Sequence, residues 1–287
     1  MKINYFLLGV ILSILSVGCK NVQTSEKPVE IKQDTVDTAV APTDFGKLLN
    51  ESPRHHEWKT LTSNERDLYT FVAYPEIKNK AKAVIIIHEN RGLNDWARYF
   101  TDALAAKGYV VLAPDLLSNF NEDVKKTTDF DNDDKAREAI YELDQDAVTK
   151  DLDAVFEYAK SINAANGKVA VVGFCWGGSQ TFNYATHNDA ISSANVFYGT
   201  APEALEKLKT INAPVYGYYG GEDNRVNATI DTITSVMKTY GKTYEPEIYE
   251  GAGHAFMRRG AESNSDSANK NAHDEAWERL LTKLEEN

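Results

Sequence analysis

A cysteine occupies a glycine-flanked turn between an apolar β-branched run and a segment able to begin a helix. Residues 168–172 lead into the sequence Gly-Phe-Cys-Trp-Gly at 173–177. Glycines on both sides suit a sharp strand-to-helix turn, because side chains there would collide with neighbouring backbone. The helix dipole and free N–H groups at such a turn favour a thiolate. The pattern predicts Cys175 as a nucleophile, and a buried structural cysteine beside a tight turn is the alternative.

Two polar residues that could activate this thiol follow later strand candidates. Asp223 comes after the apolar segment 213–220, and His254 comes after the candidate strand 246–250. Open α/β sheets place their sites at the carboxyl ends of strands, and hydrolases with a nucleophile on such a turn order nucleophile, acid and histidine along the chain. We therefore predict a triad in which His254 is the base and Asp223 orients its imidazole. Glu222 is the rival acid, and the shorter side chain favours Asp223.

The chain resembles the dienelactone hydrolases over about residues 65 to 285. The resemblance rests on Gly-Phe-Cys-Trp-Gly-Gly at 173–178, His-Glu-Asn-Arg-Gly-Leu-Asn at 88–94, Leu-Ala-Pro-Asp-Leu at 112–116 and His-Ala-Phe-Met-Arg at 254–258. It implies an α/β-hydrolase fold, with a mostly parallel sheet and helices on both faces. It also implies hydrolysis of small esters or lactones, and it favours Asp223 as the acid.

The same resemblance assigns roles around the segment 88–94. Backbone N–H groups of Trp176 and Asn90 would form the oxyanion hole. Glu89 matches a carboxylate that holds the resting thiol and takes its proton when substrate displaces it. The alternative is a structural carboxylate paired with Arg91 or with a backbone amide.

Two arginines match those that bind substrate in the family. Arg258 corresponds to an arginine that binds the substrate carboxylate, a task suited to its planar, bidentate guanidinium. A solvated arginine beside Arg259 is the alternative. A second family arginine lies in the region of residues 118–146, where Arg137 is the nearest counterpart although the local spacing departs from the family pattern.

Alternating strands and helices predict the sheet that must position these residues. The continuous apolar run 83–88 is typical of a strand buried on both faces. The expected strands are 67–74, 83–88, 109–113, 168–174, 194–199, 214–219 and 244–250, and the expected helices are 96–107, 151–162, 177–187, 228–240 and 271–284. The acidic segment 118–146 fits a lid over the active site and a solvated helix with a loop equally well.

Composition limits the partners. The chain of 287 residues carries a formal net charge of −12, which argues against nucleic acid as a partner. We expect no cofactor and no metal, because His88-Glu89 is followed by Gly92 where a zinc motif needs its second histidine. The other histidines, at positions 55, 56, 187 and 273, are expected on the surface or in loops.

The N-terminus predicts export. Residues 1–18 combine an early lysine with a short apolar run and fit a signal peptide better than a membrane span. The ending at Cys19 resembles a bacterial lipobox, although Ser16 departs from the usual leucine. We expect a lipidated Cys19, a flexible tether over 19–45 and a catalytic domain over 46–287, with a plain secretory signal, an uncleaved anchor and an edge strand at 29–31 as alternatives. Lipidation and catalysis give the two cysteines separate tasks and leave no pair for a disulfide.

The sequence thus predicts an exported lipoprotein of the bacterial cell envelope that hydrolyses small-molecule esters or lactones. Its contact with the membrane would be through the lipid anchor alone. A broad carboxylesterase or acyl-peptide hydrolase with the same triad is one alternative. A tethered binding protein that keeps the fold without the chemistry is the other.

Overall fold

The computed structural model describes residues 41–287. The expected signal peptide, Cys19 and most of the expected tether lie outside the described residues. Within the described part, no helix is both long and apolar enough to span a bilayer.

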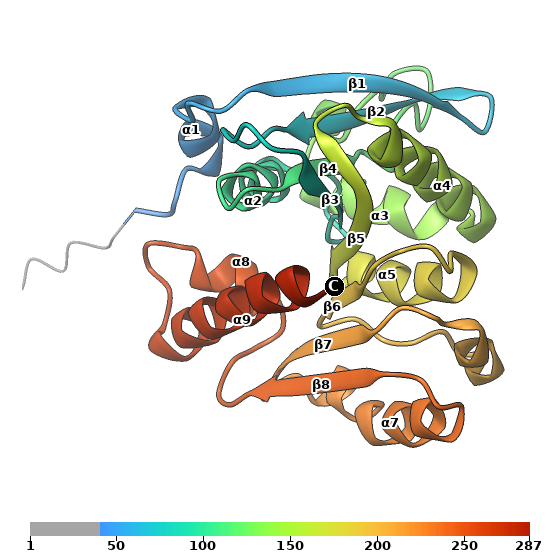
Figure 1. Cartoon of the computed structure of the whole chain (residues 1–287). Helices are drawn as coiled ribbons and strands as arrows, with labels where there is room; N and C mark the ends of the chain where they lie inside the picture. The colour runs from blue at the N-terminus through green and yellow to red at the C-terminus, as the bar shows by residue number, and fades with distance from the viewer. Residues whose placement is uncertain (1–40) are drawn as a thin grey trace, which may run out of the picture. The chain divides into compact units, whose positions relative to one another are not determined.

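One eight-stranded sheet runs through this part of the chain (Figure 1). The strand order is β1-β2-β4-β3-β5-β6-β7-β8, and only the pairs β1–β2 and β2–β4 are antiparallel. The strands are β1 (His56–Ser63), β2 (Arg66–Ala73), β3 (Ala81–Ile87), β4 (Val110–Pro114), β5 (Ala165–Phe174), β6 (Ala194–Phe197), β7 (Val215–Gly220) and β8 (Tyr244–Tyr249). The predicted α/β fold with a mostly parallel sheet is confirmed.

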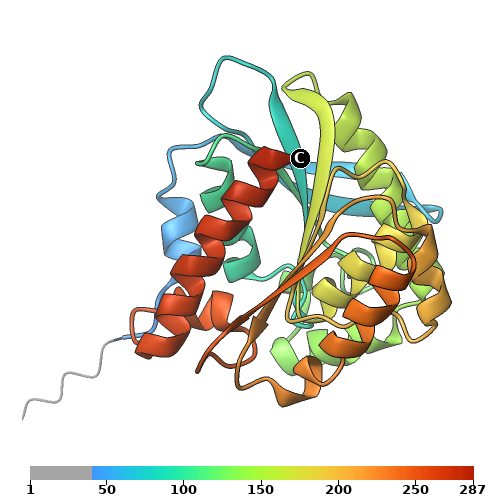
Figure 2. The same ribbon diagram turned by 60° about the horizontal axis from the view of Figure 1, so that its bottom comes forward.

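Helices cover both faces of the sheet (Figure 2). One face carries α1 (Phe45–Asn50), α2 (Asp95–Ala105), α8 (Phe256–Gly260) and α9 (Ser267–Glu286), and the other carries α3 (Asp133–Glu142), α4 (Gln145–Ser161), α5 (Trp176–His187) and α7 (Ile230–Thr239). Alternate residues of β3 explain the two layers: Ile85 packs into one core and Ile86 into the other. Short turns are α6 (Asn224–Asn227) and the 3₁₀ segments η1 (Thr127–Asp129) and η2 (Leu205–Thr210).

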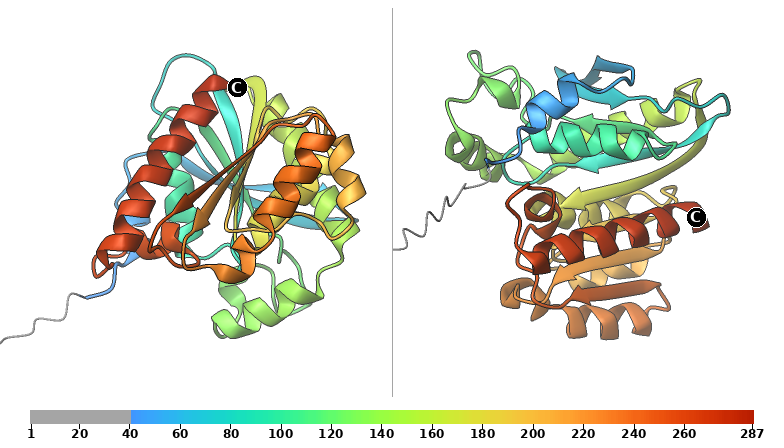
Figure 3. Two further views of the ribbon diagram at one scale, coloured as in Figure 1. Left: turned by 90° about the horizontal axis from the view of Figure 1, so that it is seen from below. Right: turned by 90° about the vertical axis from the view of Figure 1, so that its left-hand side faces the viewer.

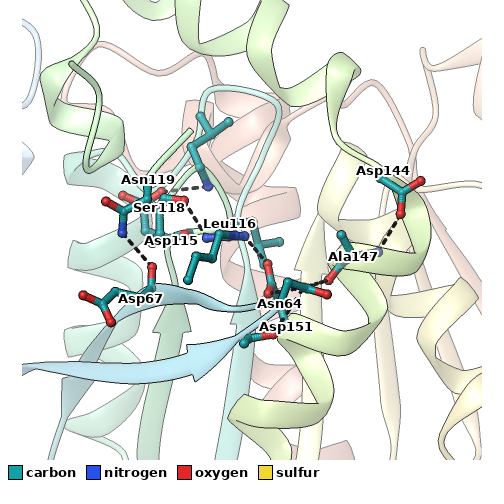
Figure 4. Close-up of polar contacts among 12 residues, drawn as sticks. Asn64, Asp67, Asp115, Leu116, Ser118, Asn119, Asp144, Ala147 and Asp151 are labelled. Atoms are coloured by element: carbon teal, nitrogen blue, oxygen red, sulfur yellow. Dashed lines mark hydrogen bonds and ion pairs between the residues drawn. The ribbon is translucent and has the colours of Figure 1, made fainter. Parts of the chain in front are cut away.

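The sequence prediction missed β1 and the hairpin that joins it to β2. β1 is largely polar and half-exposed at the edge of the sheet, so it lacks a clear alternation of apolar residues. Asn64 and Glu65 form the two-residue turn with φ angles of 50° and 59°. The Asn64 amide then donates to Ala147 O at 3.0 Å and to Asp151 Oδ1 at 2.9 Å, which fixes the hairpin to α4 (Figure 4).

Helix α4 also begins earlier than the apolar stripe indicated. Its first turn is polar, and the Asp144 side chain caps it by accepting the N–H of Ala147 at 2.8 Å. The buried face starts at Val148. A stripe of apolar residues therefore marks the packed part of a helix and leaves out its capped first turn.

The residues that precede α1 contact the rest of the domain. Ala41 O accepts the Ser263 hydroxyl at 2.6 Å, and Thr43 N donates to Glu262 at 3.0 Å. Residues 41–43 of the expected tether are therefore bound to the segment between α8 and α9, and its last residue, Phe45, begins α1.

Candidate active site

The predicted catalytic side chains follow four parallel strands. Glu89 comes two residues after β3, Cys175 directly follows β5, Asp223 follows β7, and His254 follows β8. The carboxyl ends of parallel strands meet at one edge of the sheet. The fold therefore gathers residues from four distant parts of the chain.

The turn between β5 and α5 requires its two glycines. A Cβ atom at Gly177 would overlap the carbonyl oxygens of Ile87 and His88, and one at Gly173 would overlap the backbone of Gly177. Because neither glycine has a side chain, α5 can approach the end of β3. Cys175 itself has φ 56° and ψ −115°, a strained conformation that presents its side chain at the start of α5.

Cys175, His254 and Asp223 form a continuous hydrogen-bonded line. His254 Nε2 lies 3.1 Å from Cys175 Sγ, and His254 Nδ1 lies 2.5 Å from Asp223 Oδ2. A carboxylate accepts the Nδ1 proton, so the lone pair on Nε2 faces the thiol. Asp223 is buried whereas Glu222 is exposed, and it is Asp223 that contacts the histidine.

The thiol of Cys175 is held in its neutral form. Burial, followed by the negative charge of Glu89, raises the pKa of the thiol to about 11. Backbone N–H groups of Trp176 and Asn90 hydrogen-bond to the sulfur and oppose this shift. Both predicted oxyanion donors therefore converge on the sulfur.

Glu89 is engaged by groups other than the thiol. Its Oε2 accepts from Arg258 Nε at 2.9 Å, and its Oε1 accepts from the Tyr198 hydroxyl at 3.3 Å. Arg91, the partner considered from the sequence, instead pairs with Asp133 at 2.9 Å. Arg258 is thus an ion-paired, largely buried residue and differs from the solvated alternative.

Substitution of Glu89 by glutamine is expected to speed alkylation of Cys175. A pKa of about 11 leaves roughly one thiol in a thousand ionised at pH 8. Removing the negative charge lowers that pKa, so iodoacetamide labelling at pH 8 should accelerate about three- to tenfold. Asp134→Asn, which removes a charge elsewhere on the same cavity wall, is the control. An unchanged or slower rate in Glu89→Gln would show that Glu89 does not control the thiol.

His88 is a positioning residue that the sequence prediction did not single out. Its ring is fully buried, and burial lowers its pKa to about 4, so it is neutral. Nδ1 lies 2.8 Å from the carbonyl oxygen of Glu89, and Nε2 accepts the N–H of Leu116 at 3.3 Å. The ring also stacks on Trp176. These contacts fix the loop that carries Glu89 and Asn90. The sequence signal that could have indicated His88 was a polar residue at the end of an otherwise apolar strand.

The remaining histidines differ partly from expectation. His56 belongs to β1 and contacts Asp102 at 2.6 Å, and His273 lies on α9 and stacks on Trp277. Their half-buried positions reflect packing on partners that are distant in sequence. Within residues 41–287, no group of three or more His, Cys, Asp or Glu side chains is placed to hold a metal ion.

A cavity of about 400 Å³ opens beside Cys175 and His254. Helix α3 forms one wall through Asp133, Asp134, Arg137 and Tyr141. This helix, green in Figure 3, lies on the face of the sheet opposite α9, which is red. Segment 118–146 therefore contributes directly to the site, and Arg137 lines it. The other lining residues are Glu89, Asn90, Arg91, Arg225, Ala255, Arg258 and Arg259.

Comparison with known proteins agrees with this architecture. A family model described as the dienelactone hydrolase family matches residues 68–287. A relative from Saccharolobus solfataricus named "Putative carboxymethylenebutenolidase" is 32% identical over 254 residues, covering 77% of this chain and 95% of that protein. A Bradyrhizobium protein named "Probable 2-oxo-3-(5-oxofuran-2-ylidene)propanoate lactonase" is 28% identical and covers 79% and 93% of the two chains.

A solved structure shares the fold. The crystal structure of a dienelactone hydrolase from Klebsiella pneumoniae, described as putative in its name, aligns with a TM-score of 0.71 at 22% identity, covering 82% of this chain and all of that one. The family match extends over most of the chain and includes every residue of the hydrogen-bonded line. The chain belongs to the dienelactone hydrolase family.

Proposed function

We propose that the protein hydrolyses small esters or lactones with Cys175 as the nucleophile. The observation that carries this proposal is the line from Cys175 Sγ through His254 to Asp223, with two backbone N–H groups directed at the sulfur. The names of the relatives, a carboxymethylenebutenolidase and a lactonase, support the same reaction class.

The first half-reaction transfers the acyl group to sulfur. Sγ attacks the carbonyl carbon while its proton passes to His254 Nε2, and the N–H groups of Trp176 and Asn90 stabilise the oxyanion. Collapse of the tetrahedral intermediate breaks the C–O bond, and His254 returns the proton to the leaving alkoxide. The product is a thioester, to which the resulting alcohol remains attached when the substrate is a lactone.

The second half-reaction releases the acid. Water attacks the thioester carbonyl, and His254 takes a proton from that water. Collapse expels the sulfur, which recovers a proton from His254, and the carboxylic acid leaves. Asp223 keeps the imidazole in the tautomer that both halves require and stabilises its cationic form.

Glu89 and Arg258 would couple activation of the thiol to substrate binding. A carboxylate on the substrate competes with Glu89 for the guanidinium of Arg258, because both are anions that need the same donor. Glu89, once released, is a base beside a neutral thiol. The proton transfer from Cys175 to Glu89 that the family resemblance implies would then follow substrate entry, as an alternative first step in which Glu89, in place of His254, takes the thiol proton and supplies it to the leaving alkoxide.

Arg258→Ala should therefore discriminate between substrates. A charge-assisted contact in a partly buried site contributes roughly 1.5–3 kcal/mol, which corresponds to about ten- to a hundredfold in kcat/KM. We expect that loss on a lactone carrying a carboxylate and a much smaller one on a neutral aryl ester. Equal losses on both would mean that Arg258 supports the loop carrying His254.

A panel of lactones, aryl esters and aminoacyl amides tests the proposed reaction class. Hydrolysis of lactones and esters that depends on Cys175 supports the proposal. Dominant turnover of aminoacyl amides would favour an acyl-peptide hydrolase with the same triad. Binding without any turnover would indicate a tethered binding protein.

We further propose that the protein is exported and anchored through a lipid on Cys19. The short apolar run and the lipobox-like ending of the signal segment support this. Two acyl chains suffice for stable anchoring. Cys19→Ser should release the protein from the membrane fraction or leave an unprocessed precursor, as measured by fractionation and intact mass. An unlipidated mature chain of the natural sequence would refute the anchor.

A further inference from the structure

The cavity beside Cys175 has a charge opposite to that of the whole chain. Five guanidinium groups and three carboxylates line it, which leaves a lining charge of +2 in a protein of net charge −12. Two of the arginines are neutralised locally, since Arg258 pairs with Glu89 and Arg91 pairs with Asp133. The excess positive charge therefore belongs to the remaining arginines.

Three arginines of the cavity have no carboxylate partner among residues 41–287. They are Arg137 on α3, Arg225 on α6 and Arg259 on α8. Three separate elements thus direct unpaired guanidinium groups toward one cavity. Such an arrangement favours the binding of an anion, because the guanidinium groups repel one another until an anion neutralises their charge.

Arg225 is the member of this group that is tied most closely to the reacting sulfur. It lies two residues after Asp223, so its backbone is held by the turn that positions the catalytic acid. Burial and Glu89 raise the pKa of the Cys175 thiol, and the positive charge of Arg225 opposes them. Its side chain is exposed and free to meet a ligand.

We propose that the cavity accepts an ester or lactone that carries two anionic groups, one bound at Arg258 and the second at Arg225. The inference rests on the proposed hydrolysis. A substrate with one carboxylate would leave half of the lining charge unneutralised, whereas a dianion balances it. Carboxylate and phosphonate or phosphate groups share the required chemistry, because each accepts a bidentate guanidinium.

Four 4-nitrophenyl esters test this substrate class. The acetate is neutral, the hydrogen glutarate carries one carboxylate, the tricarballylate carries two, and the 3-phosphonopropanoate carries a phosphonate. We expect kcat/KM for both dianionic esters to exceed that for the glutarate by roughly tenfold. The advantage should shrink between about 0.05 and about 0.5 M salt, because an exposed contact is screened.

Arg225→Gln is the matched variant. It should lower kcat/KM about tenfold on the dianionic esters, mainly through KM, and at most about threefold on the acetate. Lys238→Gln removes one positive charge from an exposed site on α7, outside the cavity. It should leave kcat/KM unchanged on all four esters. A response confined to the phosphonate would support the proposal and identify the second group as phosphate-like.

Two results would overturn the inference. One is a kcat/KM on the glutarate that equals the values on both dianionic esters, and the other is an equal loss of kcat/KM on all four esters in Arg225→Gln, which would make Arg225 a support for Asp223. Failure of the proposed hydrolysis has a different signature. In that case no ester is turned over, or turnover persists in Cys175→Ala.

Discussion

Replacement of Cys175 by alanine is expected to lower kcat/KM for ester hydrolysis by about 10⁴-fold or more. Without sulfur no thioester forms, and only the oxyanion donors and the binding cavity remain. Cys175→Ser is the matched variant and should keep measurable but reduced activity, because a hydroxyl depends wholly on His254 for deprotonation. Initial rates with a 4-nitrophenyl ester measure both effects.

Alanine has the same Cβ as cysteine, so the substitution adds no clash at the strained turn. Thermal unfolding of the variant should match that of the natural protein and serves as its control. Iodoacetamide provides an independent check, since stoichiometric alkylation of Cys175 should abolish hydrolysis. Full activity after such labelling would refute the nucleophile assignment.

Asp223→Asn is expected to reduce kcat by about 10³- to 10⁴-fold. The asparagine amide can donate to Nδ1, which moves the imidazole proton to Nε2, the atom 3.1 Å from Cys175 Sγ. A protonated Nε2 cannot accept the thiol proton. Measurement of kcat as a function of pH tests this prediction, because a changed tautomer lowers the plateau of the pH profile.

Glu222→Gln is the control for this prediction. Glu222 is the adjacent carboxylate, carries the same charge and is exposed. Its substitution should change kcat by less than about twofold, as is usual for surface positions. A larger loss in Glu222→Gln than in Asp223→Asn would reverse the assignment of the acid.

The parts of the fold that could be predicted are those whose signal is local. The apolar runs that became β3 and β5 are buried on both faces, so their composition alone marks them as central strands. The turn at Cys175 is sterically possible only with glycine at positions 173 and 177, and both glycines are visible in the sequence. Asp223 and His254 could be placed because each follows a strand of the parallel sheet.

The remaining features depend on contacts between distant segments. Helix α3 buries only Ala136, Ala139 and Ile140, too few apolar residues to distinguish it from a solvated segment. The bonds from Glu89 to Arg258 and Tyr198 join residues at least 109 positions apart. Nothing in the local sequence around Glu89 favours those partners over the thiol.

The cavity arginines show the same limit. Arg225 stands in a polar segment, where it looks like an ordinary surface residue, and Arg137 could be singled out only through the family resemblance. Only the fold brings α3 and α6 to the edge of one cavity. Charge at a site assembled from several elements is therefore a property of the tertiary structure.

Acid quenching during turnover of a 4-nitrophenyl ester tests the central claim most directly. The good leaving group makes acylation fast, so the thioester should accumulate before water releases it. Peptide mass analysis of the quenched protein should find the acyl group on Cys175, and a burst of nitrophenolate should match the amount of enzyme. An acyl group on another residue, or steady hydrolysis with Cys175 unmodified, would contradict the account.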